Sequence, residues 1–121
     1  MTSILREIVI DCTDTERVAA FWSAVLGWEV QREKEYAWMA AEPENPLAGM
    51  ILVFQPVPEA KTVKNRVHID VSPYRCEPAE EVERLLALGA RHVDVGQGDV
   101  PWVVLADPEG NEFCVLGRRI D

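Results

Sequence analysis

Residues 100–116, with the sequence VPWVVLADPEGNEFCVL, read as two strands joined by a tight turn. The segment 102–106 is rich in aromatic and β-branched residues, which favour strands. In the turn, Pro108 presets φ, and Gly110 can adopt the positive φ that a hairpin of this length needs. Because side chains alternate along a strand, Glu112 and Cys114 are expected to share one face of the returning strand. The sequence therefore predicts a β-hairpin at the end of the chain.

The same order of elements is expected in both halves of the chain. Each half has a strand, an amphipathic helix that ends in Leu-Gly, and three further strands. The expected strands cover 4–12, 28–32, 36–41, 49–55, 66–72, 91–95, 102–106 and 112–116, and the helices follow Thr13 and Glu77. We therefore predict an α+β fold of two βαβββ repeats, about 1–57 and about 64–121, whose curled mixed sheets surround a cavity within a single domain, 1–121.

Composition and charge exclude several classes of protein. The chain has 121 residues, of which 48% are hydrophobic and 27% charged, which is typical of a folded globular domain. It has no apolar run near the roughly 20 residues that span a bilayer, and MTSILREIVI lacks the pattern of a secretory signal, so we expect a cytoplasmic protein. The net charge of −9 disfavours nucleic acid and anionic membranes as partners. That charge is compatible with a cationic ligand, although solubility alone also explains it.

One face of each sheet is expected to remain uncovered by the helices. Its polar side chains are Glu7, Asp11, Arg66, His68, Asp70, Glu112 and Cys114. Such a face is either solvated or part of a pocket. Alternation along two other strands gives two further sets of side chains, each of which shares one face of its strand. These mainly large apolar sets are Trp102, Val104 and Ala106 in one strand, and Met50, Leu52 and Phe54 in the other. If these groups join the polar set, the face is a mixed pocket for a small molecule, and we favour this interpretation.

Tryptophans add candidates for ligand stacking. Trp22 lies in the apolar stripe of the first helix and Trp28 follows it, so both are expected to pack in the core. Trp38 and Trp102 are better placed to stack on a planar or cationic ligand. The predicted ligand-binding residues are Trp38, Phe54, His68, Trp102 and Cys114.

The segments NRVHIDV and VLADPEGNEFCVL, after DTERVAAFWSAVLGWEV, resemble those of the vicinal oxygen chelate superfamily. This superfamily includes glyoxalases, bleomycin-resistance proteins, fosfomycin-resistance enzymes and extradiol dioxygenases. More narrowly, the chain is similar to glyoxalase-like domains of actinobacterial type over essentially its whole length. The resemblance implies a small-molecule ligand, and together with exposed sheet edges it implies a homodimer.

The resemblance also implies where a metal ligand set would lie. Members with metal use a residue on the first strand, a His that opens the second repeat and a Glu on the last strand. These positions correspond to Glu7, His68 and Cys114, with Glu112 as an alternative to Cys114. A fourth ligand, a Glu in glyoxalase I, would fall near Met50 or Leu52, and both are apolar. The set is incomplete, so we expect no cofactor, although a divalent metal is possible.

Cys114 has two further interpretations. It could act as a nucleophile if His68 lowered its pKa, or it could be an inert buried thiol, which we favour. Asp70 is expected to orient His68 only through a neighbouring group.

Three functions follow as hypotheses. The first is a glyoxalase-like small-molecule-binding protein without the full metal set, which sequesters or confers resistance to a cationic or aromatic compound. This is by analogy with bleomycin-resistance proteins. The second is a metal-dependent lyase, isomerase or dioxygenase that uses Glu7, His68 and Glu112 or Cys114. The third is a structural or regulatory domain.

Overall fold

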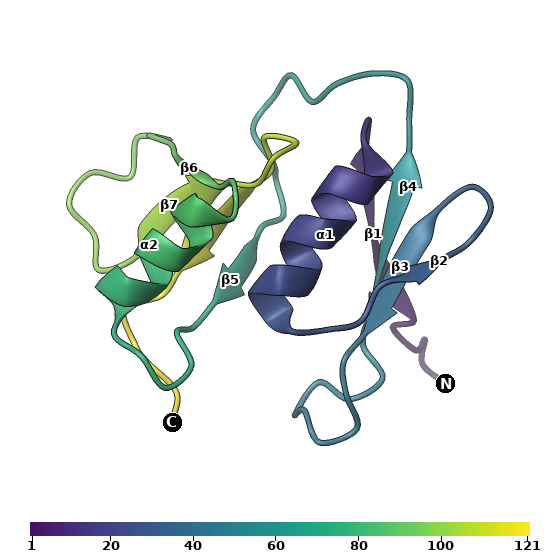
Figure 1. Cartoon of the computed structure of the whole chain (residues 1–121), viewed down its shortest axis with the longest axis horizontal. Coiled ribbons are helices and arrows are strands. Elements are labelled where there is room, and N and C mark those ends of the chain that lie inside the picture. The colour runs from purple at the N-terminus through teal and green to yellow at the C-terminus, as the bar shows by residue number, and fades with distance from the viewer. The chain divides into compact units, whose positions relative to one another are not determined.

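The computed structural model describes all 121 residues, which form two compact units, 1–60 and 61–121 (Figure 1). Each unit has a strand, a helix and three further strands, so the predicted α+β class and repeated βαβββ order are confirmed. Each unit holds one open four-stranded mixed sheet. The expectation of a single domain stays a prediction. No helix is long and apolar enough to cross a membrane.

The first unit is built on a sheet with the strand order β1-β4-β3-β2. β1 and β4 are parallel, whereas β3 is antiparallel to both of its neighbours. The elements are β1 (Glu7–Cys12), α1 (Thr15–Leu26), β2 (Gln31–Arg32), β3 (Ala37–Ala40) and β4 (Ile51–Pro56).

The start of α1 differs from the prediction. Asp14, not Thr13, is the N-cap, and its Oδ1 accepts a hydrogen bond from the Arg17 backbone N–H at 3.2 Å. Glu16 does not reach back to the cap, because its carboxylate binds the Arg32 guanidinium at 2.7 Å. The end of α1 agrees with the prediction, since Gly27 adopts the left-handed conformation with φ of 75°.

The face of the first sheet that α1 covers carries two residues that we expected on the opposite face. Cys12 contacts Thr15 of α1, so the side chains that share its parity on β1 face the helix. The parallel register places Leu52 beside Ile8 and Phe54 beside Ile10, on that same face. Phe54 is fully buried there. The predicted placement of Leu52 and Phe54 on the helix-free face is wrong, because the register of β4 against β1 cannot be read from the parity of either strand.

The second unit repeats this plan with the strand order β5-β8-β7-β6. Here β5 and β8 are parallel, and β7 is antiparallel to both of its neighbours. Its elements are β5 (Ile69–Val71), α2 (Pro78–Ala87), β6 (Arg91–His92), β7 (Val103–Ala106) and β8 (Glu112–Val115).

The helix α2 covers one face of the second sheet and leaves the other face uncovered. It begins with a capping box formed by Glu77 and Glu80, and it contacts β8. Phe113 pairs with Ile69 and Leu105 across the sheet, which gives the buried face. Cys114 pairs with Asp70 and Val104 and so belongs to the opposite face, as the alternation in the sequence predicted.

Candidate ligand-binding site

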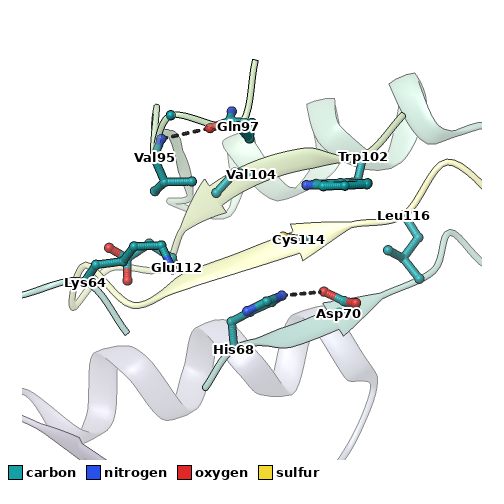
Figure 2. A pocket seen from close by; sticks show the side chains of 11 residues that line it. Lys64, His68, Asp70, Val95, Gln97, Trp102, Val104, Glu112, Cys114 and Leu116 are labelled. Carbon is teal, nitrogen blue, oxygen red and sulfur yellow. Dashed lines mark hydrogen bonds and ion pairs between the residues drawn. The ribbon is translucent and has the colours of Figure 1, made fainter. Parts of the chain in front are cut away.

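A pocket of about 510 Å³ lies in the second unit on the sheet face that carries Cys114 (Figure 2). All residues that line it belong to the range 61–121. They come from the segment before β5, from β5, β7 and β8, and from the loop that follows β6. The lining residues are Lys64, His68, Asp70, Val95, Gly96, Gln97, Trp102, Val104, Glu112, Cys114 and Leu116.

The apolar part of the pocket consists of large side chains at the β7 and β8 strands. Val104 lies beside Cys114 in the antiparallel register, and Leu116 follows β8 directly. Trp102 immediately precedes β7, and the residue is 39% exposed, so it is accessible to a ligand. Figure 2 shows this ring lying along one side of the pocket.

The polar part of the pocket includes a direct contact between His68 and Asp70. The imidazole Nε2 lies 3.2 Å from Asp70 Oδ1, and both side chains are nearly half exposed (Figure 2). The expectation that Asp70 could orient His68 only through a neighbour is wrong. His68 lies just before β5, so its backbone is not held in the ladder and its side chain can turn toward Asp70.

Cys114 is buried beneath this pair, and its environment favours the neutral thiol. Burial raises the pKa of the Cys114 thiol, and the charge of Asp70 and a hydrogen bond to it raise this pKa further. The charge of the Lys64 ammonium lowers this pKa, but by less than the other effects raise it. A nucleophilic cysteine needs the opposite shift. This environment therefore favours the neutral thiol over the nucleophilic thiolate.

Glu112 is already bound within the unit. Its two carboxylate oxygens lie 2.9 and 3.0 Å from Lys61 Nζ, and the Asn65 backbone N–H donates to Oε1 at 2.9 Å. Burial by itself would raise the pKa of Glu112, but these two hydrogen bonds outweigh it and lower the pKa. This carboxylate holds the segment before β5 against β8. The role of Glu112 as a metal ligand stays a prediction.

The residues predicted from sequence fall into two groups. His68, Trp102, Cys114 and Glu112 all line the pocket of the second unit. Glu7, Trp38 and Phe54 belong to the first unit. There Glu7 is exposed, Phe54 is buried, and Trp38 Nε1 donates to Glu33 Oε1 at 3.1 Å. Their contribution to a site stays a prediction.

Sequence reasoning missed Lys64 and the loop around Gly96 as parts of the pocket wall. This loop is shaped by Asp94, which accepts from the Gly96 N–H at 2.8 Å, and by Gln97, which accepts from the Val95 N–H at 2.8 Å. The segment VDVGQGD signals a turn. That signal does not tell which face of the sheet the loop lies against.

Three side chains of the pocket form a donor set suited to a metal ion. One ligand atom each from His68, Asp70 and Cys114 lies within 4.8 Å of the others. Imidazole, carboxylate and thiolate are all known ligands of zinc. The residues present therefore fit a divalent cation, with Asp70 beside His68 and Cys114 in the place that we expected Glu7 to take.

A family model for the glyoxalase-like domain matches residues 7–116. The chain belongs to this family. Essentially the whole βαβββ pair lies within the match, and the predicted resemblance to the vicinal oxygen chelate superfamily is confirmed. The actinobacterial type stays a prediction. A search of curated proteins found no match for this glyoxalase-like domain.

Solved structures share the fold of the glyoxalase-like domain at low identity. A fosfomycin resistance protein, FosX, from Listeria monocytogenes, complexed with Mn(II) and 1S,2S-dihydroxypropylphosphonic acid, is 18% identical with a TM-score of 0.68, covering 97% of this chain and 91% of that one. FosX from Mesorhizobium loti is 13% identical with a TM-score of 0.66, covering 98% and 94%. A glyoxalase/bleomycin resistance protein/dioxygenase family enzyme from Burkholderia phytofirmans is 16% identical with a TM-score of 0.63, covering 91% and 94%.

Proposed function

We propose that this glyoxalase-like protein binds a small organic molecule in the pocket of its second unit and so sequesters it. The observation that carries the proposal is the composition of the pocket, which combines an accessible indole ring with the polar pair of His68 and Asp70. Its volume of about 510 Å³ lies within the range of small-molecule sites.

The lining indicates the chemistry of the ligand. Trp102 offers the face of an indole ring to a planar group or a cation. Asp70 adds a half-exposed carboxylate on β5, which pairs with β8. An aromatic compound with a cationic group fits both features, and the net charge of −9 favours the approach of such a ligand.

Binding can be tested with a panel of aromatic cations, neutral aromatics and aromatic anions. The protein is kept in a chelator, and binding is followed by thermal shift and by tryptophan fluorescence. We expect at least one aromatic cation to bind and Trp102→Ala to weaken it by about tenfold, which corresponds to about 1.4 kcal/mol.

The matched control is Tyr74→Ala, which removes an exposed aromatic ring of the second unit that does not line the pocket. We expect it to leave the affinity unchanged. If no compound in the panel binds, or if Tyr74→Ala weakens binding as much as Trp102→Ala does, the proposal is wrong.

We also infer a homodimer in the cytoplasm. Each sheet ends in strands with one unpaired edge, β1 and β2 in the first unit and β5 and β6 in the second. Such edges are commonly covered by a second chain. Light scattering coupled to size exclusion should give twice the chain mass of 13.6 kDa, and a monomer at micromolar concentration would contradict the inference.

A metal-dependent lyase, isomerase or dioxygenase is the second candidate, because His68, Asp70 and Cys114 bring three ligand atoms together. A cation held there would supply a Lewis acid beside the ligand pocket. The chain itself would hold the cation through His68, Asp70 and Cys114 and orient the substrate on Trp102. If His68→Ala left both metal content and every detected activity unchanged, this candidate would fail.

A further inference from the structure

We propose that His68, Asp70 and Cys114 form a binding site for a thiophilic divalent cation of the zinc class, contained wholly within the second unit. This ligand set differs from the one that the family resemblance implies, because it uses Asp70 in place of a residue on the first strand. Under this proposal, Cys114 is a ligand in a metal site whose residues differ from the family's. The site has not been lost.

The positions of the ligand atoms carry the proposal. Two ligands at about 2.0–2.1 Å from a tetrahedral zinc lie about 3.3 Å apart, and His68 Nε2 and Asp70 Oδ1 are 3.2 Å apart. The sulfur of Cys114 completes the group, with all three atoms within 4.8 Å of one another. A thiolate ligand would lie about 3.6 Å from the other two. Binding thus requires a shift of roughly 1 Å.

The backbone fixes two of these ligands in register. Asp70 and Cys114 are paired residues on the parallel strands β5 and β8, so they point to the same face of the sheet. Cys114 is buried, whereas His68 and Asp70 are nearly half exposed toward the pocket. Three protein ligands and one side open to the pocket are the arrangement of a catalytic zinc site, not of a closed structural one.

The donor atoms select the class of cation. A thiolate is a soft ligand that suits zinc, whereas manganese and magnesium prefer oxygen ligands. The nearest other carboxylate of the pocket, Glu112, is bound by Lys61 and Asn65 and does not add a hard ligand. We therefore expect zinc or cobalt to bind more tightly than manganese.

Cobalt(II) is the probe for the test, because a thiolate ligand gives a charge-transfer absorption band in the near ultraviolet. Chelator-treated protein is titrated with cobalt(II), then with zinc in competition, and the metal content is measured after desalting. We expect one ion per chain, the charge-transfer band, displacement of cobalt by zinc, and weak binding of manganese.

Variants show which side chains bind the ion. Cys114→Ser should abolish the band, and His68→Ala and Asp70→Asn should each weaken cobalt binding by more than about tenfold. Cys76→Ser is the matched control, because Cys76 is a partly exposed thiol outside the pocket, and it should keep the band. Circular dichroism verifies that each variant is folded. If Cys114→Ser does not fold, the exposed His68 and Asp70 variants still decide the outcome.

Three results would overturn the inference: no stoichiometric binding of cobalt or zinc, tighter binding of manganese than of zinc, or an unchanged titration in the folded His68 and Asp70 variants. The inference does not rest on the proposed organic ligand, which is measured in chelator. Failure of one experiment therefore leaves the other informative.

Discussion

Two side chains that lie two positions apart on β8 have opposite environments. Glu112 is 13% exposed and is neutralised by the Lys61 ammonium, with a further hydrogen bond from the Asn65 backbone. Cys114 lies beside Asp70, whose negative charge opposes ionisation of the thiol. The strand thus presents one carboxylate with a structural partner and one thiol that faces the pocket. This difference separates the residue that stabilises the unit from the residue that can bind a ligand.

Glu112→Gln should lower the free energy of unfolding by about 1 to 2 kcal/mol at neutral pH, because it removes a largely buried, charge-assisted hydrogen bond. The folded protein lowers the pKa of Glu112 below its usual 4.5, so this stabilisation is fully present above that pH. It is lost as the pH falls through the lower, folded pKa. Urea denaturation of both proteins at several pH values measures the effect.

The control for this experiment is Glu83→Gln, on the exposed side of α2. It should change stability little at any pH. A wild-type advantage over Glu112→Gln that grew as the pH fell below 4.5 would contradict the assignment.

At the scale of elements, the hairpin between β7 and β8 is held by one fully buried side chain, Asp107. Its Oδ1 accepts from the backbone N–H groups of Glu109 and Asn111, each at 2.9 Å, and its Oδ2 accepts from Asn111 Nδ2 at 3.0 Å. Gly110 has φ of 89°, as the turn predicted from sequence requires. The turn therefore fixes the register that aligns Cys114 with Val104.

Asp107→Ala should cost about 2 to 3 kcal/mol of stability, because it leaves partly buried backbone donors of the turn without this acceptor. Asp94→Ala is the comparison, since Asp94 makes the related bond to Gly96 in an exposed loop. It should cost less than about 1 kcal/mol. Equal losses in urea denaturation would show that the burial of Asp107 is not the cause.

At the scale of the whole molecule, the dominant property is an acidic net charge of −9, with a sequence pI of about 4.7. The two units contain separate sheets, and Asp and Glu outnumber Lys and Arg by 21 to 12. Some of the cations are also paired with carboxylates, such as Arg32 with Glu16 and Arg119 with Glu77. The excess of carboxylates over cations thus disfavours binding of a polyanion.

The whole chain should therefore bind duplex DNA very weakly at about 0.15 M salt. We expect a dissociation constant larger than about 10⁻⁴ M. Fluorescence anisotropy with a labelled duplex measures this, with a basic DNA-binding protein of similar size as the positive control. Binding that weakened steeply with added salt would contradict the prediction.

Local signals in the sequence were sufficient to predict the order of strands and helix in each unit. The two Leu-Gly helix ends, the turn at Asp107–Asn111 and strand alternation predicted the repeated βαβββ order and the face shared by Glu112 and Cys114. These features depend on backbone preferences and on the period of a strand, which act over a few residues. For the same reason the resemblance to the family was visible in short segments.

Only the tertiary structure decided which side chains meet. The parallel register of β1 with β4 places Phe54 on the sheet face that α1 covers. Glu16, which we expected to cap the helix, binds the Arg32 guanidinium instead. Lys61 and Asn65 bound Glu112, while His68, Asp70 and Cys114 came together on one face. Each of these outcomes depends on contacts between distant segments, whose register and competition for partners are not encoded in any local pattern.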